Sequence, residues 1–325
     1  MSRLTLCFSI FDSALFLLEQ LRREGKIPPP GQLATPLKTL ASLSPLEPFL
    51  TLSNGQTIPQ LAYGMYLVHN DQMGVQTIVH AVEAGYRHFD GASKYDNEAI
   101  LGQALQQTGL PRSDFFLVSK VWNDAVKNGR TAVRASVEAS LAAVNFGSYF
   151  DLFFIHWPVA GHFVEAYKEL EELYKEGKIR GIGISNFDMD EYEALVAGGI
   201  TIPPVVAQME VSPVMYRPRL VEYFQNKGIA VAAFKALNRA ACLENQVIVS
   251  LAAKYSVTPA QILLRWSVQK GLIVVSKTAT PSRMVENRNL HFTLSDPDMT
   301  LLDSLTTEED VKQRTELERT RKEQL

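Results

Sequence analysis

The chain has 325 residues and a mass of 36.2 kDa, with 46% hydrophobic and 21% charged residues. This composition provides a sizeable core, and it excludes both a mini-protein and global disorder. The 32 Lys and Arg residues against 35 Asp and Glu give a formal net charge of −3, so no basic field indicates nucleic acid as a partner. The cysteines Cys7 and Cys242 are too few for a disulfide framework or a zinc cluster, which favours a reducing, cytoplasmic location.

Residues 1–48 are expected to form an N-terminal extension and linker. The apolar stretch 4–18 is interrupted by Asp12 and is shorter than the roughly 18 residues that span a bilayer, so no membrane partner is predicted. It also has no clear small-residue cleavage pattern, which argues against a signal peptide and favours a docked or mobile helix. The prolines within residues 26–31 cannot continue a helix, because proline lacks the amide donor.

The main domain is predicted to start with a small hairpin. Ser53-Asn54-Gly55 lies between the short apolar runs 50–52 and 56–58, and Asn-Gly in such a setting is a strong hairpin signal.

Beyond the hairpin, helical patterns repeatedly end at a glycine that is followed by a short apolar run. This occurs at Gly85, Gly177, Gly228 and Gly271, and glycine suits the left-handed turn after a helix. Continuous apolar runs without alternation are typical of parallel strands buried on both faces. The predicted strands are residues 61–65, 86–90, 115–120, 151–155, 179–185, 205–210, 229–234 and 272–275.

Eight such βα units predict an α/β protein with a (β/α)8 TIM barrel over residues 49–305. The alternative is a doubly wound sheet, but residues 181–186 lack the third glycine of its dinucleotide fingerprint. Between the strands lie amphipathic helices; in one of them Phe163, Tyr167, Leu170 and Tyr174 repeat at helical spacing, with Glu165, Lys168, Glu171 and Lys175 expected to face away. The charged tail 306–325 is expected to be a solvated helix or a frayed end.

Polar residues at the carboxyl ends of barrel strands are the candidates for chemistry. Asp90, Lys120 and His156 end the second, third and fourth predicted strands, and Tyr95 follows Asp90 by five residues. A buried lysine beside a carboxylate stays charged, and that cation is expected to lower the phenol pKa from its usual value of about 10, which would make Tyr95 an acid. Each residue alone has an ordinary structural explanation, but four together favour an active site.

Four segments carry a resemblance to the aldo-keto reductases, a family of barrel-fold, nicotinamide-dependent carbonyl reductases. They are residues 85–98, 117–122, 154–158 and 177–187. The resemblance covers about residues 49–305. It implies reduction of a small-molecule aldehyde or ketone, with Tyr95 as general acid, Lys120 and Asp90 tuning it, and His156 orienting or polarising the carbonyl.

The same resemblance implies NADPH/NADP+ as the cofactor. Ser185, Asn186 and Gln208 would hold the nicotinamide carboxamide, and Phe234 would stack where the family commonly has Tyr. The residues implied for the adenosine end are Lys277, Thr278 and Arg283 at the 2′-phosphate, with Glu286 and Asn287 at the adenine. The stretch 234–239 departs from the family pattern, which leaves its contacts with the pyrophosphate open.

The aromatic residues Tyr66, Trp122 and Trp157 follow the first, third and fourth strands. They either wall a substrate pocket for apolar or moderately polar carbonyls or fill the barrel. No metal is expected, although a metal-dependent hydrolase using His88 and Asp90 is a remote alternative. A second alternative is a nicotinamide-binding regulatory barrel subunit with little turnover. The expected partner is a small-molecule carbonyl substrate, and the chain is expected to be a monomer or weak dimer.

Overall fold

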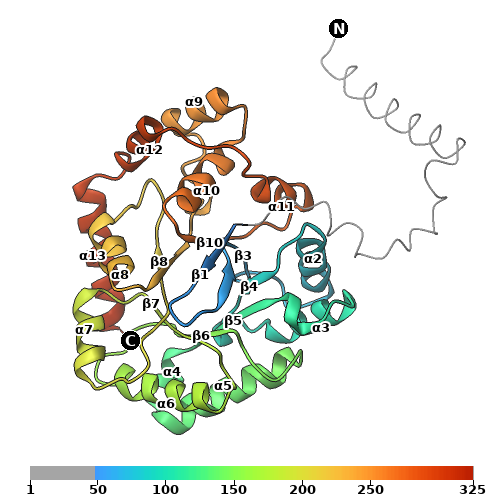
Figure 1. The fold of residues 1–325 in the computed structure, drawn as a ribbon, viewed down its shortest axis with the longest axis vertical. Coiled ribbons are helices and arrows are strands. Elements are labelled where there is room, and N and C mark those ends of the chain that lie inside the picture. Colours follow the sequence, from blue (N-terminus) through green and yellow to red (C-terminus); the bar gives the residue numbers. More distant parts are fainter. Residues whose placement is uncertain (1–47, 325) are drawn as a thin grey trace, which may run out of the picture. The chain divides into compact units, whose positions relative to one another are not determined.

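The computed structural model describes residues 48–324, so the predictions for the N-terminal extension, residues 1–47, lie outside the described residues. The described part contains a two-stranded hairpin and a closed barrel of eight parallel strands in the order β10-β3-β4-β5-β6-β7-β8-β9 (Figure 1). The strands are β1 (Phe49–Thr51), β2 (Thr57–Pro59), β3 (Leu61–Gly64), β4 (His88–Asp90), β5 (Phe116–Val121), β6 (Leu152–Ile155), β7 (Ile182–Ser185), β8 (Val206–Glu210), β9 (Ala230–Phe234) and β10 (Ile273–Ser276). The predicted TIM barrel is confirmed.

Helices form a ring around the central strands (Figure 1). They are α2 (Gln72–Glu83), α3 (Glu98–Gln107), α4 (Asn123–Lys127), α5 (Arg130–Val144), α6 (Phe163–Lys175), α7 (Met189–Ala197), α8 (Pro218–Asn226), α9 (Gln246–Tyr255), α10 (Pro259–Gln269), α11 (Pro281–Arg288), α12 (Asp296–Asp303) and α13 (Glu308–Glu323), with 3-10 turns η2 (Ser93–Tyr95), η3 (Arg112–Asp114) and η4 (Asn238–Ala240). Within residues 48–324 no helix alone is long and apolar enough to span a membrane; α9 and α10, bent at 87°, meet that length and composition only as a pair.

The glycine pattern marks the helix ends as predicted. Gly85, Gly177, Gly228 and Gly271 all have positive φ, between 71° and 99°. Each follows the last residue of a helix by two positions, where a side chain would be strained. These glycines therefore turn the chain from a helix directly into the next barrel strand.

The hairpin closes the end of the barrel where the strands begin. Its loop has five residues rather than the three that lie between the predicted runs, because Thr51 pairs with Thr57, and Gly55 has φ 84°. Leu52 and Ile58 are buried and pack with the inward-facing apolar residues of the barrel strands. The opposite end of the barrel is consequently the open one.

One expectation for α6 is wrong. Glu171 does not face away but is buried, and its Oε1 accepts hydrogen bonds from the backbone amides of Thr201 and Ile202. These amides follow α7, so the carboxylate satisfies donors that would otherwise be buried without partners. The other three residues expected on that face are exposed or half-buried.

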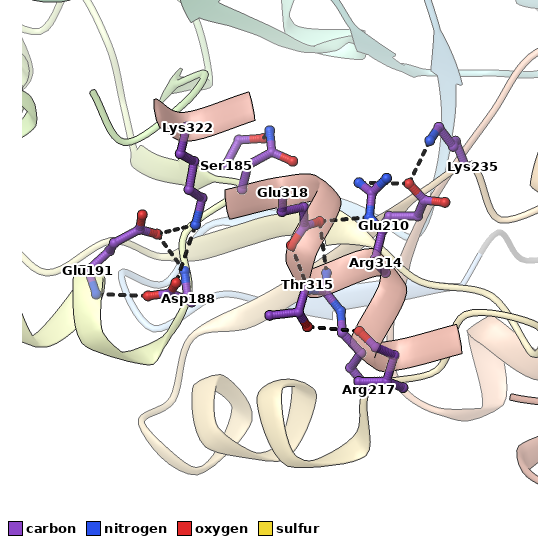
Figure 2. A network of polar contacts seen from close by, with 12 residues as sticks. Ser185, Asp188, Glu191, Glu210, Arg217, Lys235, Arg314, Thr315, Glu318 and Lys322 are labelled. Atoms are coloured by element: carbon purple, nitrogen blue, oxygen red, sulfur yellow. Dashed lines mark hydrogen bonds and ion pairs between the residues drawn. The ribbon is translucent and has the colours of Figure 1, made fainter. Parts of the chain in front are cut away.

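The charged tail is not frayed, and most of its residues are exposed, as expected for a solvated helix. It forms α13, which is anchored by buried charges: Arg314 pairs with Glu210 at 2.9 Å, and Glu318 pairs with Arg217 at 2.8 Å. Near the end of the helix, Lys322 pairs with Glu191 at 2.6 Å (Figure 2). The pattern predicts a solvated helix because it has few apolar residues; what it does not predict is that buried ion pairs also hold this helix on the barrel.

Candidate active site

A cleft of about 1150 Å³ opens at the carboxyl ends of the barrel strands. All but one of the residues predicted for the site line it, namely Tyr66, Asp90, Tyr95, Trp122, His156, Trp157, Ser185, Asn186, Gln208, Phe234, Lys277, Thr278, Arg283, Glu286 and Asn287. The exception is Lys120, which does not line the cleft and is fully buried, with 1% of its side chain exposed. The strands thus bring together residues that are up to about 200 positions apart in the chain.

An ion pair lies at the base of the cleft. Alternation along β5 places Phe116, Val118 and Lys120 on the inner face of the barrel. There the Lys120 Nζ donates to Asp90 Oδ1 at 2.6 Å and to the Gly91 carbonyl at 2.7 Å. The second Asp90 oxygen accepts from Gln208 Nε2 at 2.6 Å, so the buried carboxylate is paired on both oxygens.

Tyr95 lies beside this pair without bonding to it. The Lys120 Nζ is 5.4 Å from the centroid of the Tyr95 ring. Burial raises the pKa of the Tyr95 phenol well above its usual value of 10, and Asp90 raises it further. The expectation of a lowered phenol pKa is therefore wrong for this structure, because desolvation and the neighbouring carboxylate outweigh the attraction of the Lys120 cation for the tyrosinate. The phenol stays protonated at neutral pH.

His156 is a neutral histidine on the same cleft. Burial, followed by the charge of Lys120, lowers its pKa well below the usual 6.5. Its ring centroid is 5.8 Å from that of Tyr95 and 4.9 Å from that of Trp122, both edge-on. The site thus contains two uncharged groups that can hydrogen-bond a carbonyl oxygen.

The ends of β7 and β8 provide amide and hydroxyl groups. Asn186, with φ 63°, donates from Nδ2 to the His156 carbonyl at 2.9 Å and to Ser185 Oγ at 3.1 Å. Its Oδ1 is buried without a hydrogen-bond partner, which is costly unless a ligand supplies a donor. An amide group of a bound ligand would satisfy it.

Cationic residues follow β10 at the outer end of the cleft. Lys277 and Arg283 are exposed, and within the described part of the chain neither makes an ion pair. Glu286 accepts from Thr258 Oγ1 at 2.9 Å, and Asn287 is buried. The start of α11 adds free backbone amides, so this end is suited to a phosphate.

The loop after β9 departs from regular backbone. Lys235, Asn238, Arg239 and Ala240 all have positive φ, between 44° and 68°, a region in which non-glycine residues are uncommon. Phe234 lines the cleft just before this loop. The loop folds tightly against the cleft, where Lys235, Arg239 and Leu243 also line it.

The three predicted aromatic residues line the cleft near His156. Tyr66 is 51% exposed and contacts Tyr95 edge-on, with 5.2 Å between ring centroids. Trp122 contacts His156 and lies under the Lys94 Nζ at 5.2 Å. They wall the cleft rather than fill the barrel interior, since none of them is fully buried.

The metal-hydrolase alternative finds no support in His88. Its Nδ1 contacts the Pro59 carbonyl of the hairpin at 2.9 Å, and burial lowers its pKa to about 4. Among the described residues, no group of three or more His, Cys, Asp or Glu side chains could hold a metal ion.

The structure adds residues to the cleft that the sequence did not indicate. They are Lys94 beside Tyr95, the loop residues after β9, Thr258 to Ala260, and Arg314 and Arg321 of α13. The strand-end rule alone could have found Lys94, since it lies in the same loop as Tyr95. No local signal pointed to α13, whose residues reach the cleft from the far end of the chain.

Comparisons with known proteins agree with this geometry. Residues 61–307 match the model of the Aldo/keto reductase family. The chain is 34% identical to a glyoxal reductase of Bacillus subtilis over 267 residues, covering 82% of this chain and 95% of the relative. Among solved structures, an aldo/keto reductase of Brucella melitensis has a TM-score of 0.76 at 34% identity, covering 80% of this chain and all of that one. An aldo-keto reductase of Bombyx mori in complex with NADP has a TM-score of 0.75 at 29% identity, covering 81% and 94%.

Proposed function

The chain belongs to the Aldo/keto reductase family of oxidoreductases, and from this we propose that it reduces a small aldehyde or ketone to the alcohol with NADPH. The observation that carries the proposal is a single cleft that holds a protonated phenol, a neutral imidazole and a buried, unpartnered amide oxygen. The first two are suited to a carbonyl oxygen, and the third is suited to a carboxamide.

The residues of the cleft fit the proposed cofactor. Asn186 Oδ1 is an unused buried acceptor that a carboxamide N–H would satisfy, and Phe234 offers an aromatic ring in the same cleft. Lys277 and Arg283 would pair with a 2′-phosphate. When bound, the cofactor supplies the hydride. The Bombyx mori relative, which is in complex with NADP, supports this assignment.

Tyr95 is proposed as the proton donor. A carbonyl carbon that accepts hydride leaves negative charge on its oxygen, and that alkoxide is more basic than a phenolate. Proton transfer from Tyr95 is therefore favourable even though burial raises the phenol pKa. The Lys120 ammonium, 5.4 Å from the ring, then stabilises the tyrosinate that remains.

His156 is proposed to orient the carbonyl. A neutral imidazole can donate one hydrogen bond without competing with Tyr95 for the proton, and its depressed pKa keeps it in this form. The hydrogen bond strengthens as charge develops on the oxygen, so it stabilises the transition state more than the ground state. The aromatic wall offers an apolar surface to the part of the substrate that surrounds the carbonyl, and the Bacillus subtilis relative is named for a small dicarbonyl.

The test is Tyr95→Phe, with Tyr149→Phe as the matched control. Tyr149 loses the same hydroxyl, but its ring stacks on Arg180, 3.4 Å away, and does not line the cleft. We expect Tyr95→Phe to lower kcat by about 10²–10⁴, measured by NADPH oxidation with a panel of aldehydes and ketones, while the affinity for NADPH from fluorescence titration stays unchanged. Undiminished turnover in Tyr95→Phe would refute the assignment. Tight NADPH binding without turnover of any carbonyl would favour the regulatory alternative.

A further inference from the structure

The walls of the cleft carry an excess of positive charge, although the chain as a whole has a net charge of −3. Among residues 48–324, two acidic residues line it, Asp90 and Glu286. The cationic residues that line it are Lys94, Lys235, Arg239, Lys277, Arg283, Arg314 and Arg321. Such a local excess in a concave site raises the local concentration of anions.

Some of these charges are already compensated. Asp90 is paired with Lys120. Glu210 accepts from Lys235 at 2.6 Å and from Arg314 at 2.9 Å, and Arg314 also pairs with Glu318 (Figure 2). These two cations therefore serve mainly to fix α13 and the loop after β9.

The proposed cofactor accounts for a second group. Lys277 and Arg283 lie after β10 and at the start of α11, where a phosphate is expected. Arg239 lies in the loop after β9 and also lines the cleft; we assign it to the pyrophosphate of the proposed cofactor. Two cations remain unassigned, Lys94 and Arg321.

Lys94 lies at the reacting end of the cleft. It directly precedes Tyr95 in η2, and its Nζ is held 5.2 Å from the ring centroid of Trp122. Trp122 is in turn 4.9 Å from the His156 ring, centroid to centroid. The ammonium and the imidazole are thus within reach of the two ends of one small substrate.

Arg321 lies on the last turns of α13. The next residue, Lys322, is anchored to Asp188 at 3.3 Å and to Glu191 at 2.6 Å, just after the strand that ends at Ser185. Arg321 lines the cleft, and within the described residues it has no ion-pair partner.

We propose that Lys94 and Arg321 select carbonyl compounds that carry an anionic group, a carboxylate or a phosphate. The inference rests on the proposed function and names its substrate class. The reaction is the reduction of one carbonyl by one NADPH and one proton to an alcohol and NADP+, and the anionic group is unchanged. Its role is to anchor the far end of the substrate while the carbonyl oxygen faces Tyr95 and His156.

Matched substrates separate charge from shape. In the first arm, 4-formylbenzoate is compared with its neutral methyl ester; in the second, glyceraldehyde 3-phosphate is compared with glyceraldehyde. We expect kcat/KM to be higher for the charged member in at least one arm, and that arm identifies the group. The preference should fall as ionic strength rises, because partly exposed charges are screened.

Two variants assign the preference to residues. Lys94→Met and Arg321→Gln should each reduce the charged-to-neutral ratio of kcat/KM by about fivefold, which is the upper range for one partly exposed ion pair. The matched controls are Lys127→Met and Arg319→Gln, because Lys127 is exposed on α4 and Arg319 pairs only with Glu316 and Glu323 of its own helix. Both controls should keep the wild-type ratio.

A binding measurement avoids any dependence on turnover. Quenching of tryptophan fluorescence measures the affinity for the product 4-(hydroxymethyl)benzoate and for its neutral methyl ester. The affinity for the charged product, relative to that for the ester, should be lower in Lys94→Met and Arg321→Gln than in the wild type. A charged-to-neutral ratio of kcat/KM near one in both arms would overturn the inference while leaving carbonyl reduction intact. So would variants that lower kcat/KM equally for the charged and the neutral substrate. If neither member of any pair is reduced, the proposed function itself fails.

Discussion

Variants of the Asp90–Lys120 pair can separate the contribution of this pair to folding stability from its contribution to catalysis. Its atoms are 2.6 Å apart, and the side chains are only 5% and 1% exposed. Replacing Lys120 by Met leaves a buried carboxylate with Gln208 as its remaining side-chain partner. Replacing Asp90 by Asn leaves a buried ammonium with the Gly91 carbonyl. Each single change leaves a buried charge without its oppositely charged partner, which lowers the free energy of unfolding by about 3–5 kcal/mol.

The double variant Asp90→Asn/Lys120→Met buries no charge. We expect it to be less destabilised than either single variant, because removing both partners spares the desolvation penalty. Urea unfolding at pH 7 measures this, with equal m-values required for the comparison. Additive destabilisation of the two single changes would refute the reasoning, since it would mean that the two charges do not interact.

Activity should not follow stability in this series. The double variant lacks the ammonium that stabilises the tyrosinate, so we expect its kcat to remain at least about 10²-fold below wild type. Reductase rates restored together with stability would show that the pair is needed for folding alone, and the role proposed for Lys120 would be withdrawn.

Two further predictions concern protonation and the C-terminal helix. Burial raises the pKa of Tyr95 and lowers that of His156. The protonated phenol and the neutral imidazole, which are the reactive forms, therefore coexist over a wide pH range. We expect kcat/KM for reduction to be constant over about pH 6–9. A fall on the alkaline side near pH 8 would instead mean that Lys120 does acidify the phenol. Arg314→Met removes the cation between Glu210 and Glu318 and should make α13 the first segment cut in limited trypsin digestion. Cleavage no faster than in wild type would contradict its anchoring role.

Much of the barrel follows from local sequence. Apolar runs that follow a glycine placed four of the eight strands, and apolar runs alone placed the others, because a left-handed turn and a doubly buried strand both leave strong local signals. The same rule placed Asp90, His156 and Tyr95 around one cleft, since strand ends converge in this fold. Strand boundaries differed by up to three residues, as at β7, which starts at Ile182 rather than at 179.

Burial of charged groups was harder to predict. Glu171 occupies a position that fits the polar face of α6, yet it is buried because amides after α7 need an acceptor. The prediction of a lowered pKa for Tyr95 was wrong for a similar reason. The sequence indicates which charges are near the phenol, but not how much water is removed from around it. Desolvation depends on the whole assembled site and has no signature within a short segment.

The C-terminal helix shows why a charged pattern is a poor guide to exposure. Arg314 and Glu318 are four residues apart, which usually indicates a solvated helix stabilised by its own ion pairs. Here both are buried, and each also pairs with a residue of the barrel about 100 positions earlier. Sequence spacing is the same in both cases, so only the tertiary partner distinguishes them.

Net charge is equally uninformative about a concave site. The value of −3 excludes a broad basic surface, but it averages over solvated side chains whose fields are screened within about 8–10 Å. The field in the cleft depends on the few charges that line it and on which of them are paired. Two of its cations are paired with Glu210, and the proposed cofactor accounts for three more. The charge that a substrate would meet therefore comes from Lys94 and Arg321, and neither can be identified from composition.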